Sequence, residues 1–161
     1  MTVVDLSYAA KKTEPGIVLG ICIKGWHVGW STGRAGQPVK CGLLRPQERH
    51  EGKTIPVAHR AASVFRTLLA LSKEEGVELV LQEFVKSASG PIWNIPPLLT
   101  VALGSQYTEI RDWMEAIKVD KKSLNSWASL ALGKPPEHDV VSQAMGLAAV
   151  GSQEFARQIK A

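Results

Sequence analysis

Cysteine is scarce in this sequence, and long apolar runs are absent. Its two cysteines, Cys22 and Cys41, lie in apolar surroundings and have none of the close spacings of zinc ligands or disulfide frameworks. No run approaches the roughly 18 apolar residues that a membrane-spanning helix needs, and no basic segment followed by an apolar one opens the chain. We therefore expect buried free thiols, no membrane span and a cytoplasmic location.

The composition is that of an ordinary globular chain, with 45% hydrophobic and 21% charged residues, which excludes disorder as the default. A chain of 161 residues fits one domain whose core is large enough to need no disulfide or metal. We expect a loosely attached arm over residues 1–15 and a single domain over residues 16–161. The net charge of +4 permits a nucleic-acid partner without requiring one.

The hydrophobic pattern predicts an antiparallel three-strand meander followed by helix-connected strands. The expected strands are Ile17–Ile23, Trp26–Ser31, Val39–Leu44, Val77–Phe84 and a brief segment at Ala116–Val119. The expected helices are Val57–Glu75, Leu98–Ile117, Lys121–Gly133 and Asp139–Lys160, with loops at 45–56 and Lys86–Pro97. This order predicts an α/β fold with a mixed sheet and helices on both faces.

Three segments carry a family resemblance. They are Ile17-Val-Leu-Gly-Ile-Cys-Ile-Lys-Gly-Trp, Leu79-Val-Leu-Gln-Glu-Phe and Val140-Val-Ser-Gln-Ala-Met-Gly-Leu-Ala. In this order they resemble the RuvC-type Holliday junction resolvases, whose motifs are an opening strand ending in Gly-Ile-Asp, a central strand ending in Glu and a last helix with Asp-x-x-Asp. The likeness covers about residues 17–150 and implies a ribonuclease-H-like fold, with a member from a phage, plasmid or other mobile element.

The resemblance also implies a cluster of carboxylates that holds two divalent cations for phosphodiester cleavage. The corresponding positions are neutral in this chain: Cys22, Gln82, Val140 and Gln143. Mg²⁺ and Mn²⁺ prefer oxygen ligands, chiefly carboxylates. We therefore expect a vestigial site without bound metal or catalysis, filled by a neutral hydrogen-bonded cluster, in a pseudoenzyme that acts by binding.

The alternative is an active, divergent endonuclease that uses Mg²⁺ or Mn²⁺ on Holliday junctions or other DNA structures. The acids available to it are Glu83, Asp139, Asp112 and Glu109. Glu83 is expected to face away from the site, because successive strand residues point to opposite faces, and Asp139 is expected to cap the last helix.

The expected partner is a protein of DNA processing or transfer, which this chain would inhibit, or else branched or duplex DNA. Trp93 lies in a proline-rich connection and is a candidate to anchor a protein or stack on a base. Lys86, Lys121 and Lys122 are candidates to contact phosphates. The resemblance further implies a homodimer.

Overall fold

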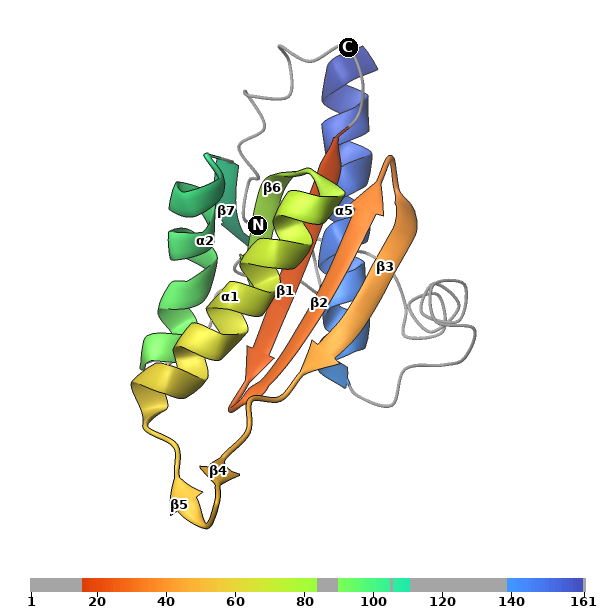
Figure 1. Cartoon of the computed structure of the whole chain (residues 1–161). Coiled ribbons are helices and arrows are strands. Elements are labelled where there is room, and N and C mark those ends of the chain that lie inside the picture. Colours follow the sequence, from red (N-terminus) through yellow and green to blue (C-terminus); the bar gives the residue numbers. More distant parts are fainter. Residues whose placement is uncertain (1–15, 84–89, 105, 111–138, 161) are drawn as a thin grey trace.

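The computed structural model describes residues 16–83, 90–104, 106–110 and 139–160, and its centre is a five-stranded mixed sheet (Figure 1). The strands are β1 (Ile17–Lys24), β2 (His27–Arg34), β3 (Gln37–Leu44), β6 (Val77–Glu83) and β7 (Gln106–Ile110). Their spatial order is β3-β2-β1-β6-β7, with β1 antiparallel to β2, β2 antiparallel to β3, and β1, β6 and β7 parallel. The predicted meander and helix-connected strands are confirmed.

Helices cover both faces of this sheet, as expected (Figure 1). Helix α1 (Val57–Glu75), the 3₁₀ helix η2 (Pro91–Asn94) and helix α2 (Ile95–Leu103) lie on one face. Helix α5 (Asp139–Lys160) crosses β1, β2 and β3 on the other face. The main core fills the space under α1 and α2. Its fully buried side chains include Leu19, Ile21, Leu68, Val80 and Leu99.

Helix α1 has the bounds that the sequence predicts. Ala61, Val64 and Leu68 are buried at helical spacing, so one stripe faces the sheet. Gly76 ends the helix in the left-handed conformation with φ +71°, and its N–H donates to the Ser72 carbonyl. Glycine adopts this conformation most readily, so Gly76 is a specific sequence signal for the end of the helix.

Glycines bring α5 against the sheet at backbone distance. A Cβ atom added at Gly20 would collide with the Ala144 carbonyl, and one added at Gly29 would collide with the Val140 carbonyl. On the helix, a Cβ at Gly151 would collide with the Leu81 side chain. The helix is therefore held close to the sheet, and small residues are required where the two surfaces meet.

Two expectations about the middle of the chain are wrong. The expected loop at 45–56 contains a two-stranded hairpin, β4 (Arg49–His50) and β5 (Lys53–Thr54). The expected helix Leu98–Ile117 ends at Leu103, because Gly104 takes the left-handed conformation with φ +67°. The chain then runs as β7 at the edge of the sheet.

Helix α2 begins three residues earlier than Leu98, because prolines fit the first turn of a helix. The expected arm at 1–15, the segment Ala116–Val119 and the helix Lys121–Gly133 lie outside the described residues. Among the described helices, none combines the length and apolarity needed to cross a membrane.

Candidate functional site

The site predicted from the sequence begins at Cys22, near the end of β1. Ile21 and Ile23 point into the core under α1, so alternation directs Cys22 to the face that α5 covers. Cys22 is 4% exposed and belongs to a second apolar cluster, with Cys41, Val140, Val141, Ala144 and Met145. The structure therefore brings two of the predicted site residues, Cys22 and Val140, into one cluster.

Gln143 is a third predicted residue at the same place. The Cys22 thiol donates a hydrogen bond to its side-chain oxygen, with an Sγ–Oε1 distance of 2.7 Å. The two residues are 121 positions apart in the sequence, so the first strand and the last helix meet here through side chains. The predicted neutral, hydrogen-bonded contact is present between these two residues.

The surroundings of this contact are apolar. Val140 is 4% exposed, and Leu43 packs against the cluster from β3. Cys41, also in the cluster, is buried, and this desolvation raises the pKa of its thiol from 9.0 to about 11. This apolar environment disfavours negative charge. Thiols, amides and methyl groups therefore fit it better than carboxylates.

The strand register separates Gln82 from Cys22. In the parallel ladder Ile21 pairs with Gln82, and Ile21 faces α1, so Gln82 lies on the opposite face of the sheet from Cys22. The place of Gln82 in the site stays a prediction, and the register indicates that its side chain lies across the sheet from Cys22. The next position along β6, Glu83, ends the strand and pairs with Ile110 of β7.

An irregularity in the ladder explains part of this difference. Ile17 pairs with Val77, but Val18 pairs with Leu79, so Glu78 is an extra residue in β6. Such a bulge shifts the alternation of the strand against its neighbour. Because β6 is buried on both faces, its apolar run carries no alternation from which this shift could be read.

The chemistry of positions 22, 140 and 143 does not fit a pair of divalent cations. A thiol, a methyl-bearing side chain and an amide whose oxygen already accepts a hydrogen bond supply no negative charge. These three positions supply no carboxylate, and carboxylates are the ligands that balance the charge of two dications. Among the described side chains, no group of three or more His, Cys, Asp or Glu residues is arranged to hold a metal ion.

The remaining sequence candidates separate into described and undescribed residues. Trp93 lies in η2, half-buried, and packs against the core under α1. Asp139 is the first residue of α5, and Glu109 pairs with Gln82 in the ladder between β6 and β7. Lys86, Lys121, Lys122 and Asp112 lie outside the described residues.

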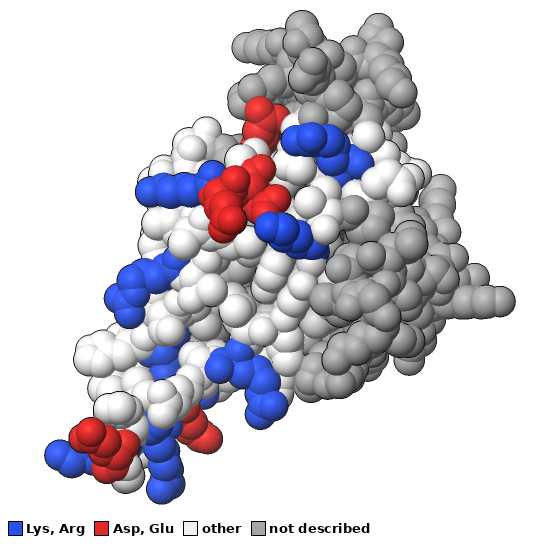
Figure 2. Space-filling view, turned by 45° about the vertical axis from the view of Figure 1, so that its right-hand side comes forward, with Lys and Arg blue, Asp and Glu red and all other residues white. Residues whose placement is uncertain are grey.

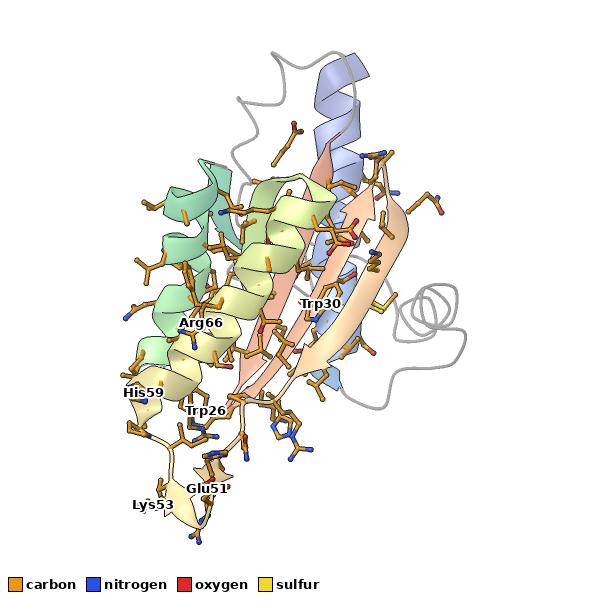
Figure 3. The ribbon with its side chains drawn as sticks, viewed as in Figure 1. Trp26, Trp30, Glu51, Lys53, His59 and Arg66 are labelled. Carbon is orange, nitrogen blue, oxygen red and sulfur yellow. The ribbon has the colours of Figure 1, made fainter. Side chains whose placement is uncertain are left out.

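A feature that the sequence did not reveal lies at the end of the sheet beyond Cys22. The Arg60 guanidinium of α1 stacks over the Trp26 ring of the β1–β2 turn, 4.1 Å from its centroid. Figure 3 labels Trp26 at the lower end of the sheet. Sequence periodicity places Arg60 in the helix but gives no sign of this partner, which is 34 positions away in the chain. The contact holds the Arg60 guanidinium beside the turn that joins β1 and β2.

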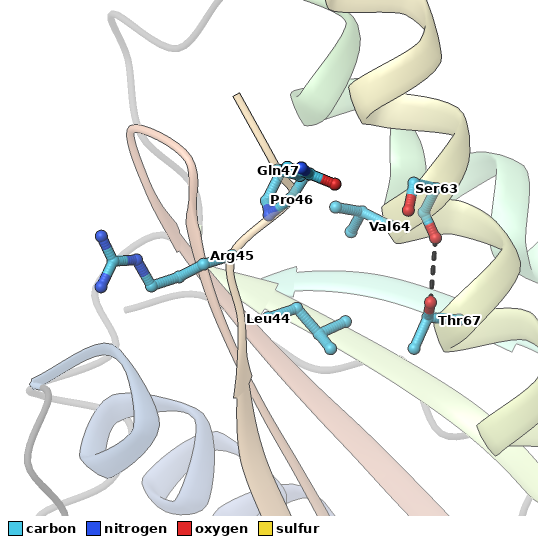
Figure 4. A pocket seen from close by; sticks show the side chains of 7 residues that line it. All are labelled: Leu44, Arg45, Pro46, Gln47, Ser63, Val64 and Thr67. Atoms are coloured by element: carbon cyan, nitrogen blue, oxygen red, sulfur yellow. Dashed lines mark hydrogen bonds between the residues drawn. The ribbon is translucent and has the colours of Figure 1, made fainter. Parts of the chain in front are cut away.

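A small open pocket lies on the same side, between the end of β3 and α1 (Figure 4). Its volume is about 160 Å³, and it is lined by Leu44, Arg45, Pro46, Gln47, Ser63, Val64 and Thr67. The Thr67 hydroxyl donates to the Ser63 carbonyl at 3.0 Å, and the Arg45 side chain points away from the pocket (Figure 4). The pocket is on the α1 face and is separate from the Cys22–Gln143 contact.

The fold is a mixed α/β fold of the ribonuclease-H-like kind, and Holliday junction resolvases are among its structural neighbours. RuvC from Thermus thermophilus superposes with a TM-score of 0.64 at 13% identity, covering 89% of this chain and 96% of RuvC. The same protein in complex with a Holliday junction substrate gives 0.66 at 14% identity, with 88% and 95% covered. The yeast mitochondrial resolvase Ydc2 gives 0.53 at 12% identity, with 96% and 87% covered.

No family model matches the chain, and no curated protein matches it in sequence. The likeness to RuvC is therefore one of fold. It agrees with the fold expected from the three sequence segments, and it leaves activity to be argued from the site itself.

Proposed function

We propose that this chain is a RuvC-like pseudo-nuclease that binds branched or duplex DNA and does not cleave it by two-metal chemistry. The observation that carries the proposal is the Cys22–Gln143 hydrogen bond, which occupies the meeting point of β1 and α5 with neutral groups. The fold supports the DNA partner, since a structural neighbour has been seen with a Holliday junction substrate. The setting we propose is DNA processing or transfer in a phage, plasmid or other mobile element.

Two readings compete with this proposal. The first is a divergent metal-dependent endonuclease, for which Glu83, the last residue of β6 and the neighbour of Gln82 in the sequence, is the candidate acid. The second is a protein that binds and inhibits another protein of DNA processing. Trp93, its candidate anchor, is half-buried against the core, which leaves less of the indole for a partner.

The test is a labelled four-way junction incubated with the full chain in EDTA, in Mg²⁺ and in Mn²⁺. We expect a shifted complex in all three conditions and no cleavage. Binding is expected to weaken with salt, as it does when lysines and arginines neutralise phosphates. Glu83→Gln is expected to bind like the unmodified chain.

Cleavage that needs a divalent cation and is lost in Glu83→Gln would overturn the proposal in favour of the nuclease. Absence of any complex at low salt, for both the junction and a linear duplex of the same length, would leave the protein partner. The two failures are distinct, because the first is read from product strands and the second from the free probe.

A further inference from the structure

A cluster of cations lies where the β4–β5 hairpin projects beyond the sheet (Figures 1 and 2). In Figure 2 lysines and arginines surround this narrow lower end, with carboxylates among them, and a larger group of carboxylates lies farther up the molecule. We name as the basic end the residues Lys24, Arg45, Arg49, Lys53 and Arg60. All are exposed except Arg60, which is partly buried.

The strand registers place these residues together. Lys24 ends β1 and pairs with His27. Val28 pairs with Leu44 at the end of β3, so Arg45 follows at the same edge of the sheet. The hairpin continues directly from this edge, and the first turns of α1 follow it. The basic end therefore combines four segments of the chain that lie at the same end of the molecule, and we call their joint surface the ridge.

Arg60 is held in place before any partner arrives. Its guanidinium stacks on Trp26, and its Nε–H is buried without a hydrogen-bond partner among the described residues. A planar guanidinium fixed in this way loses little conformational entropy when it binds a phosphate. The stack also ties α1 to the β1–β2 turn, so the ridge has a rigid base.

The charge of the ridge is not compensated within the described part of the chain. Its carboxylates are Glu48 and Glu51, so three of the five positive charges remain unbalanced. Among the described residues, Lys40 pairs with Glu75 and His50 lies near Glu51. Neither pair contains a residue of the basic end. A ridge of this kind attracts polyanions over a distance of about one Debye length, roughly 8–10 Å.

We propose that the basic end binds the phosphate backbone of one duplex arm of the DNA, beyond the strand ends that carry Lys24 and Arg45. This inference rests on the proposed function. Three of the five cations are arginines, whose forked donors match phosphate oxygens. The row of cations along a projecting ridge suits a linear array of phosphates better than a folded acidic protein. The contact carries no base recognition, so it is independent of sequence.

The experiment compares two double variants of equal charge change. Arg49→Ala with Lys53→Ala removes two cations from the hairpin, and Arg34→Ala with Lys73→Ala removes two exposed cations from the opposite end of β2 and α1. Affinity for a fluorescent linear duplex is measured by anisotropy over a salt series. Each lost phosphate contact reduces the slope of log K against log salt by about 0.9.

We expect the hairpin variant to lower the slope by about 1.8 and the affinity by roughly 60-fold at about 0.1 M salt. The control variant is expected to stay within about twofold of the unmodified chain. If both variants lose the same affinity, or if neither loses any, the basic end is not the contact, although the chain still binds DNA. Failure of the unmodified chain to bind DNA would instead overturn the proposed function. Displacement of the duplex by polyglutamate at matched charge would assign the ridge to an acidic protein.

Discussion

Restoring negative charge at the Cys22–Gln143 contact should show whether the site tolerates carboxylates without a cation. The change is Cys22→Asp combined with Gln143→Glu, and Cys22→Asn, which keeps Gln143, is the matched neutral control. The two variants have nearly the same shape and differ in two charges. The present Sγ–Oε1 distance of 2.7 Å places the new carboxylates close together.

The size of the effect follows from Coulomb's law. Two unit charges about 4 Å apart at an effective dielectric constant of about 20 repel by about 4 kcal/mol, so the charged variant should lose about that much free energy of unfolding relative to the control at neutral pH. Repulsion between like charges raises the pKa of one carboxyl group in the folded state above its unfolded value. The folded state then binds more protons, so the deficit should shrink as the pH falls to about 4.

Manganese provides the second arm of the assay. Urea denaturation is followed by tryptophan fluorescence with and without about 10 mM Mn²⁺. If the new pair binds Mn²⁺ with a dissociation constant of about 0.1 mM, the ion restores about 2.7 kcal/mol. The unmodified chain and the Cys22→Asn control are expected to gain nothing. A manganese-dependent gain of similar size in the unmodified chain would refute the argument that neutral groups fill this site.

Two further predictions concern the same face of the sheet. Gly29→Ala should lower the free energy of unfolding by about 1–3 kcal/mol, because its methyl group would collide with the Val140 carbonyl. Gly33→Ala is the control, since Gly33 lies in the same strand and its added methyl carbon would be 3.1 Å from its nearest neighbour, the Ala148 carbonyl oxygen; equal effects of the two changes would contradict the close approach of α5. The Cys41 thiol should react with a maleimide about 100-fold more slowly in the folded chain than in urea at about pH 8, because its raised pKa keeps it protonated. Peptide mapping distinguishes it from Cys22, and equal rates in the two states would contradict its burial.

The elements with strong periodicity could be predicted from the sequence. Helix α1 shows buried residues at helical spacing and ends at a glycine that any helix would use as a stop. Strand β1 is a short apolar run between glycines, which is typical of a strand buried on both faces. In both elements the local sequence signals and the tertiary packing agree, so the predicted bounds lie close to the observed ones.

The failures have different physical causes. Apolar residues continue past Leu103, so Gly104 reads as a tolerated glycine inside a long helix rather than as its end. The face of Gln82 depends on one extra residue in a parallel ladder, which no property of β6 alone reveals. The contact between Cys22 and Gln143 spans 121 positions and was found through the family resemblance rather than through periodicity.

The glycine-mediated seating of α5 has a mechanical consequence. Gly20 and Gly29 bring the first turns of the helix onto the main chain of β1 and β2. Farther along the helix, Ser152 accepts a hydrogen bond of 2.8 Å from the Gly36 N–H in the β2–β3 turn. At these points the helix lies directly on the main chain, so few side-chain rearrangements are open to it, and a tilt of α5 would require the strands to move as well. The Gly36–Ser152 hydrogen bond therefore ties the β2–β3 turn to the same helix whose first turns lie against Cys22.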